Sequence, residues 1–125
     1  MSNPQARALD PEPFLPLNPR DVLILLALAE GALHGYALIK HTEELSEGRV
    51  RMDPANLYRL LKKLVRDGLV EDAGEPEGAS DGQRRRCYAI TELGRAVVGA
   101  ESERLARLAE LARERNLLSS SSDLR

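Results

Sequence analysis

The chain has 125 residues, of which 42% are hydrophobic and 30% charged, and its net charge is −2. This length suits one domain with at most one additional helix, and the composition is too apolar for a wholly disordered chain. The longest apolar run, Val22–Ala29, is far shorter than the roughly 18 residues needed to span a bilayer, so we expect a cytoplasmic protein without a membrane segment. One cysteine and two histidines exclude an internal disulfide and leave most metal and acid–base chemistry without its usual groups. We therefore predict no cofactor, no metal and no enzymatic activity.

The first helix is predicted to begin at Pro19. Asn18 is a suitable N-cap, proline suits the first helical position, and Asp21 lies in the first turn, where an acid interacts favourably with the helix dipole. Val22–Ala29 is apolar on nearly every face, so this helix should lie deep in the fold. Before it, residues 1–17 contain four prolines, which block regular helix and sheet and predict a flexible arm.

A second helix is predicted from about His34 to Ser46, followed by a short extended linker at Arg49–Arg51. His34 is interpreted as a capping or packing residue, with a proton or metal role as the alternative. His41 lies on the same helix, but two histidines without a third ligand make a weak metal site.

The third helix has the clearest signals. Asp53 is its expected N-cap, Pro54 its first residue and Gly68 its end. The predicted buried stripe has 3-and-4 spacing and consists of Leu57, Leu60, Leu61 and Leu64. The opposite face is predicted to be exposed and carries Ala55, Arg59, Lys62 and Arg66, flanked by Tyr58 and Lys63. This cationic segment gives a local positive potential that the net charge conceals.

Two strands, Leu69–Asp72 and Arg86–Ile90, are predicted to form a hairpin around a loop rich in glycine and acidic residues. A second basic cluster, at the start of the returning strand, consists of Arg84, Arg85 and Arg86. Cys87 is interpreted as a small buried hydrophobe, with a redox switch as the alternative.

The last helix is predicted from Glu92 to about Arg115, with Thr91 as its N-cap. Its apolar stripe has too few partners within one domain, so we expect a homodimer whose interface includes Val98, Leu105, Leu108, Leu111 and Ala112. The alternative is a helix that folds back on its own domain. A ligand pocket lined by Val22, Leu25 and Leu108 is also compatible with the sequence.

Three helices followed by a hairpin, with a short basic third helix, are typical of a winged helix-turn-helix domain. A helix of about 14 residues is roughly 21 Å long and fits the major groove of DNA, which is about 12 Å wide. We predict that the bases are contacted by Asn56, Tyr58 and Arg59. We predict that phosphates are contacted by Arg51, Lys62, Lys63, Arg66, Arg84, Arg85 and Arg86. Half-buried packing is an equal alternative for Tyr58, and a solvated strand edge is the alternative for the arginine cluster.

Four segments resemble the PadR family of bacterial transcriptional regulators, namely Leu33–Ile39, Asp53–Leu64, Asp67–Val70 and Arg84–Arg95. The resemblance covers about residues 18–98 and implies a homodimeric winged-helix repressor with the C-terminal helix as the dimerisation element. The single long C-terminal helix is similar to that of the family's short subtype. The wing loop departs from the family pattern because it is acidic, with Glu75, Glu77 and Asp81, which weighs against insertion of its tip into a groove. The chain has no tryptophan, so ligand binding between tryptophans does not carry over.

The predicted fold is mainly α with a small β-hairpin (α+β). Its four regions are a flexible proline-rich arm (1–17), a winged-helix DNA-binding domain (18–91), a dimerisation helix (92–116) and a disordered tail (117–125). The predicted function is a DNA-binding transcriptional regulator, a repressor that binds a two-fold double-stranded operator as a homodimer. Release by a small-molecule effector is left open. The alternatives are a winged-helix protein-interaction module without DNA binding and a small hydrolase or transferase, although the sequence lacks the motifs of the latter class.

Overall fold

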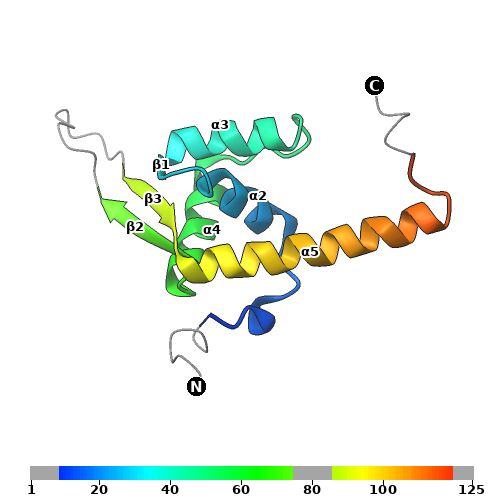
Figure 1. Ribbon diagram of the computed structural model, residues 1–125. Helices are drawn as coiled ribbons and strands as arrows, with labels where there is room; N and C mark the ends of the chain where they lie inside the picture. Colours follow the sequence, from blue (N-terminus) through cyan, green and yellow to red (C-terminus); the bar gives the residue numbers. More distant parts are fainter. Residues whose placement is uncertain (1–8, 75–85, 120–125) are drawn as a thin grey trace, which may run out of the picture.

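The structure, a computed structural model, describes residues 9–74 and 86–119. In chain order its elements are a short 3-10 helix η1 (Glu12–Phe14), α2 (Pro19–Leu28), β1 (Leu33–His34), α3 (Gly35–Leu45), α4 (Pro54–Arg66), β2 (Val70–Gly74), β3 (Cys87–Ile90) and α5 (Glu92–Glu114). Figure 1 shows α2, α3 and α4 gathered beside the strands, while α5 runs along this group and then extends beyond it. The predicted combination of helices with a small β-hairpin is confirmed.

The four α-helices begin where polar side chains cap them. Each cap accepts a hydrogen bond from a backbone N–H two or three residues further on, at 2.8–3.3 Å, and the capping residues are Asn18, His34, Asp53 and Thr91. A side-chain acceptor at this position satisfies a backbone donor that has no partner within the helix. The capping interpretation of His34 is therefore confirmed.

The core is built from aliphatic side chains, as the scarcity of aromatic residues predicts. Side chains that are almost inaccessible to solvent come from every helix except η1 and from the start of the hairpin, and they include Ile24, Leu25, Leu28, Leu38, Leu57, Leu61, Leu64, Leu69, Val70 and Val97. The 3-and-4 spacing on α4 is confirmed at three of its four leucines, and Leu60 is half-buried.

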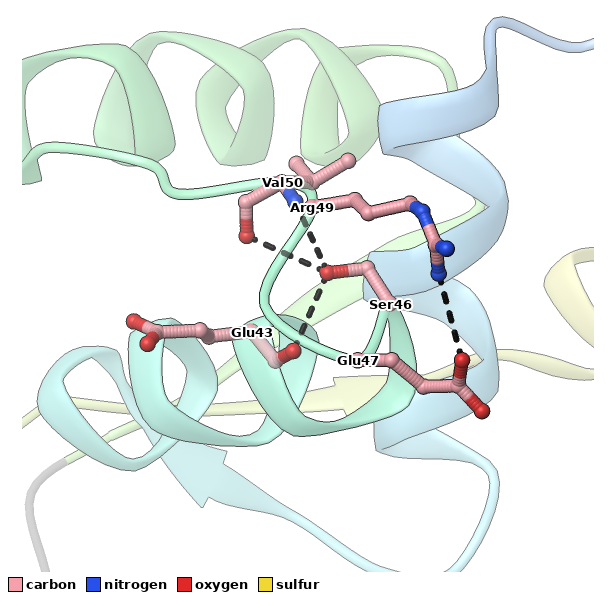
Figure 2. A network of polar contacts seen from close by, with 5 residues as sticks. All are labelled: Glu43, Ser46, Glu47, Arg49 and Val50. Atoms are coloured by element: carbon pink, nitrogen blue, oxygen red, sulfur yellow. Dashed lines mark hydrogen bonds and ion pairs between the residues drawn. The ribbon is translucent and has the colours of Figure 1, made fainter.

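The linker between α3 and α4 is held by Ser46 (Figure 2). The Ser46 hydroxyl accepts the N–H of Val50 at 2.9 Å and shares its proton between the carbonyls of Glu43 (3.0 Å) and Val50 (3.3 Å). Glu47 and Gly48 both have positive φ, 56° and 80°, which turns the chain back toward α4. One side chain thus fixes the path from α3 into α4.

The strands form a three-stranded antiparallel sheet in the order β1-β3-β2. Leu33 pairs with Tyr88, and Val70 pairs with Ile90. The hairpin of β2 and β3 is the predicted one, although β2 begins one residue later than expected, at Val70, and β3 begins at Cys87. The sequence did not predict β1, because two residues are too few to show a pattern of alternation.

The segment before α2 differs from the flexible arm expected for residues 1–17. From residue 9 onward this segment includes η1, and Phe14, Leu15 and Leu17 pack against the core. Proline excludes a regular helix interior but suits the first turn, and Pro13 lies at that position in η1. Burial of three apolar side chains then orders the segment. Residues 1–8 lie outside the described part of the chain.

Helix α5 has two unlike halves. The first half packs against the domain through Gly94, Val97, Val98 and Glu101, which are buried. Beyond Leu105 most side chains are exposed, which agrees with the projecting end of α5 in Figure 1. The helix closes at Asn116, which has a φ of 61°, with the N–H of Leu117 donating to the carbonyl of Ala112. Of the tail predicted for 117–125, the residues after Ser119 lie outside the described part.

Candidate nucleic-acid interface

Helix α4 presents two opposite faces. Leu57, Leu61 and Leu64 anchor one face in the core. The opposite face exposes Arg59, Lys62 and Arg66, and we call these three residues the cationic face. Because the leucines fix the rotation of the helix about its own axis, these three side chains must point to solvent.

Three polar side chains are linked at the beginning of α4. Asp53 accepts hydrogen bonds from the backbone N–H of Asn56 at 2.8 Å and from its side-chain amide at 3.3 Å, and the Asn56 oxygen accepts one from the Arg59 guanidinium at 2.6 Å. This chain orients Asn56 and Arg59, two of the three residues predicted to contact bases. An oriented guanidinium loses less side-chain entropy when it binds a partner.

The third predicted base contact, Tyr58, has a mixed environment. Its side chain is 39% exposed, and its ring lies so close to Gly35 at the start of α3 that a Cβ on that glycine would collide with the phenol group. Tyr58 therefore contributes to the contact between α3 and α4 while part of its surface remains accessible. Tyr36, the residue after Gly35 in the first turn of α3, is 65% exposed.

The cations predicted to contact phosphates fall into two groups. Arg51, Lys63 and Arg86 have acidic partners, since they lie 3.6, 3.6 and 2.7 Å from carboxylates of Glu43, Asp21 and Asp72. Within the described ranges, no carboxylate lies within 4 Å of Arg59, Lys62 or Arg66. Arg84 and Arg85 lie outside these ranges.

The structure adds one cation that the sequence reasoning missed, Arg20. Between the start of α2 and α4 lies a polar groove of about 390 Å³, lined by Asn18, Arg20, Asn56, Arg59 and Leu60. Arg20 is exposed and, among the described residues, has no carboxylate within ion-pair distance. No local signal in the sequence marks it, because its proximity to Arg59 comes from the packing of two helices.

Two buried carboxylates flank the first turn of α2. The pKa of Asp21 is raised, chiefly because burial penalises its charged form, and although Lys63 lowers it, Asp67 adds to the increase. The pKa of Glu101 is lowered by the hydrogen bonds that it accepts from Arg104, against a smaller opposing effect of burial. The Arg104 guanidinium donates to both Glu101 oxygens at 2.7 Å.

The predicted dimerisation residues separate into two groups. Leu105 and Leu108 are 42% and 47% exposed, and Leu111 and Ala112 are half-buried. Val98 is 6% exposed and belongs to the core of its own domain, so it has little surface left for a partner. The expectation for Val98 is corrected because α5 rests on α2 in its first half.

The predicted pocket between the first and last helices also differs in its lining. A groove of about 350 Å³ is lined by Leu17, Pro19, Val22, Leu23, Glu101, Arg104 and Leu105. Val22 is shared with the prediction, but Leu25 is fully buried in the core, so it faces away from the groove.

Other candidate sites have plain structural descriptions. Across residues 9–74 and 86–119 no group of three or more metal-binding side chains occurs, and His41 lies 3.9 Å from Glu44. Cys87 lies half-buried on β3. In the same ranges, none of the helices combines the length and the hydropathy that a membrane crossing requires.

The helix-turn-helix of α3 and α4, followed by the β2–β3 wing, defines a winged-helix protein. Residues 24–100 match the model of the Transcriptional regulator PadR-like family, and the chain therefore belongs to this family of transcriptional regulators. The family resemblance that the sequence predicts is confirmed.

The chain is also similar to individual proteins and solved structures. The Transcriptional regulator Rv3488 of Mycobacterium tuberculosis is 38% identical over 91 residues, which cover 73% of this chain and 77% of that protein. An uncharacterised 37.1 kDa protein in transposon TN4556 of Streptomyces fradiae is 36% identical over 91 residues, but the match spans only 24% of its length. The Bacillus subtilis PadR structure in complex with operator DNA has a TM-score of 0.58 and 22% identity, covering 68% of this chain and 47% of that one.

Proposed function

We propose that this PadR-like protein represses transcription by binding a two-fold DNA operator as a homodimer. The observation that carries the proposal is the cationic face of α4, which has no acidic partners among the described residues and lies opposite a leucine face fixed in the core. Cations without acidic partners are the groups that neutralise phosphates and release counterions. The operator complex of the related Bacillus subtilis PadR supports the same role for this fold.

In this proposal α4 enters the major groove. Its 13 residues give a length of about 20 Å, and its first turns carry Asn56, Tyr58 and Arg59, which contact base edges. Lys62 and Arg66 contact phosphates on one side of the groove. Arg20 contacts the backbone on the other side, from the polar groove that it shares with Arg59.

Three other cations that the sequence predicts to contact phosphate, Arg51, Lys63 and Arg86, would have to exchange a carboxylate for a phosphate. Such an exchange offsets much of the electrostatic gain, because the existing ion pair is lost. We therefore assign the larger contributions to Arg20, Lys62 and Arg66.

The homodimer is proposed to form through the second half of α5. Leu105 and Leu108 expose apolar surface beside the groove of about 350 Å³ that Leu105 also lines. Pairing of α5 with its copy would set the two α4 helices about 34 Å apart, one turn of DNA. Release by a small molecule stays a prediction, and such a molecule lowers DNA affinity only by its differential affinity for the two dimer arrangements.

The test begins with selection of bound fragments from genomic DNA. With a selected fragment, the double variant Arg59→Ala/Lys62→Ala is expected to bind about 100-fold more weakly, at two contacts of roughly 1–3 kcal/mol each, with an unchanged thermal unfolding midpoint. Arg49→Ala is the control, since Arg49 is an exposed cation in the linker after α3, outside the cationic face and α5, and it already pairs with Glu47 at 3.2 Å. If the wild-type protein retains no fragment even at low salt, the protein-interaction alternative replaces the proposal.

The dimer is tested separately by analytical ultracentrifugation. Leu105→Glu/Leu108→Glu is expected to give a folded monomer with greatly weakened operator binding. Leu117→Glu is the control because Leu117 is 77% exposed beyond the end of α5. A wild-type monomer at micromolar concentration contradicts this part of the proposal.

A further inference from the structure

Asp21, at the start of α2, is a buried carboxylate whose polar contacts do not replace all the hydrogen bonds that it would make with water. Its side chain is 3% exposed, and its Oδ2 lies 3.6 Å from the Lys63 ammonium. Among the described residues, its Oδ1 has no hydrogen-bond partner. The carboxylate borders a hollow of about 200 Å³ between the segment before α2 and α4. Burial of a carboxylate oxygen without a partner opposes folding.

The charged groups around Asp21 come from α4. Lys63 and Asp67 line the hollow from that helix, while the segment before α2 contributes uncharged residues, namely Pro13, Phe14, Pro16, Leu17 and Asn18. Arg20 is the neighbour in sequence, and its side chain lines the separate polar groove. Among the residues that the structure describes, Lys63 is therefore the one cation that lines the hollow beside the carboxylate.

Lys63 also differs from its neighbours on α4. Lys62 and Arg66 have no carboxylate partner within the described ranges, whereas Lys63 is directed back across the helix pair toward α2. A cation already paired with a buried carboxylate is a poor phosphate ligand, because a phosphate would leave that carboxylate without its counterion.

We propose that the Asp21–Lys63 ion pair is a positioning contact that sets the orientation of α4 against α2 for DNA binding, and that Lys63 does not contact phosphate. This inference rests on the proposed function. It also gives α2 a role in recognition. The first turn of α2 lines the groove of about 350 Å³ through Pro19 and Val22 and contacts α4 through Asp21, so it connects that groove to the DNA-contacting helix.

The variant Asp21→Asn distinguishes a phosphate-binding Lys63 from a positioning Lys63, because the two roles predict opposite changes in DNA affinity. If Lys63 contacts phosphate, removal of the acid frees the lysine and takes away a negative charge, so DNA affinity rises. If the pair positions α4, affinity falls, and we expect a loss of about tenfold, equivalent to roughly 1.4 kcal/mol. Increased affinity overturns the proposal.

A salt series with Lys63→Met provides a second measurement. A phosphate contact contributes about 0.9 to the slope of log K against log salt concentration, so its removal flattens the slope. The positioning role predicts weaker binding with an unchanged slope, and Lys62→Met, the matched control from the adjacent position, is expected to flatten it. Lys63→Arg, which retains the cation, should keep most of the affinity.

The double variant Asp21→Asn/Lys63→Met tests whether the two residues act as one unit. We expect it to bind no more weakly than the worse single variant, because either change already breaks the pair. Additive losses overturn the proposal.

Hydrogen exchange of the DNA-free protein distinguishes failure of this inference from failure of the proposed function. Asp21→Asn is expected to increase exchange of the α4 amides near Lys63 while leaving those of the first half of α5 unchanged. If the wild type binds no DNA, the proposed function fails, but unchanged α4 exchange in this variant would overturn the positioning role independently.

Discussion

Asp21 in the first turn of α2 and Glu101 in α5 are both buried carboxylates, but their partners differ. Glu101 receives both hydrogen bonds of the Arg104 fork, each at 2.7 Å. Within the described part of the chain, Asp21 has one longer ion pair, at 3.6 Å, and an oxygen without a hydrogen-bond partner. The environment of Glu101 favours its charge, whereas that of Asp21 opposes it.

The difference indicates two uses of a buried acid. A buried carboxylate that accepts charged hydrogen bonds at both oxygens stabilises the fold, and Glu101 does so within α5 through Arg104. A carboxylate that opposes folding persists where another requirement acts on it, and for Asp21 we infer that this requirement is the orientation of α4.

The largest expected effect on stability is that of Glu101→Gln. The variant keeps the shape of the side chain but loses a charged acceptor inside the protein, and we expect the free energy of unfolding to fall by about 1–3 kcal/mol. Urea denaturation measures this loss. The control is Glu103→Gln on the exposed side of α5, with an expected change below about 0.5 kcal/mol. Equal losses of unfolding free energy in Glu101→Gln and Glu103→Gln would show that the buried carboxylate of Glu101 does not stabilise the fold.

Ser46→Ala tests a polar contact that carries no charge. Loss of the Ser46 hydroxyl leaves the N–H of Val50 without its acceptor, and we expect about 1 kcal/mol lower unfolding free energy. Ser102→Ala is the control, because the Ser102 hydroxyl donates only to the carbonyl of Val98 within its own helix and alanine favours helix. If Ser102→Ala lowers the unfolding free energy more than Ser46→Ala, Ser46 does not hold the linker between α3 and α4 as described.

Arg20→Ala is expected to leave stability unchanged and to weaken DNA binding about three- to tenfold, since it removes one exposed phosphate contact. The slope of log K against log salt should decrease by about 0.9. Fluorescence anisotropy with a selected fragment measures both the affinity and the slope, with Arg49→Ala as the control. An unchanged slope removes Arg20 from the interface.

The smallest effects are expected from pH, and they have opposite signs at the two carboxylates. The pKa of Glu101 is lowered from 4.5, so its contribution to stability is present at neutral pH and is lost as pH falls through its folded pKa. The pKa of Asp21 is raised from 3.8, so its ionisation lowers stability as pH rises through its folded pKa.

Denaturation of the wild type and both variants between pH 3 and pH 8 tests these signs. The deficit of Glu101→Gln should shrink toward acid pH. Asp21→Asn should be at least as stable as the wild type at neutral pH, and the two should converge in acid. If Asp21→Asn is less stable than the wild type and the difference in unfolding free energy grows toward neutral pH, the ionised Asp21 does not oppose folding.

The sequence predicts well what local chemistry controls. The caps at Asn18, Asp53 and Thr91 follow from residue type, and the leucine spacing of α4 fixes which side of the helix is exposed. Each of these signals lies within one turn of the residue that it concerns.

Contacts between distant segments were not predictable in the same way. The pairing of Lys63 with Asp21 and the proximity of Arg20 to Arg59 depend on how α2 packs against α4. From the sequence, Lys62 and Lys63 are both predicted to contact phosphate, and Val98 and Leu105 are both predicted to lie in the dimer interface. Tertiary packing alone distinguishes the members of each pair.

The central claim is that the cationic face of α4 binds the DNA backbone. It is tested most directly by the salt dependence of binding to a selected fragment for the wild type and for Lys62→Ala/Arg66→Ala. We predict a steep decrease of log K with log salt for the wild type, and a slope smaller by about 1.8 for the double variant, with unchanged unfolding. If binding does not depend on salt, or if the two proteins have equal slopes, the cationic face of α4 does not bind the DNA backbone.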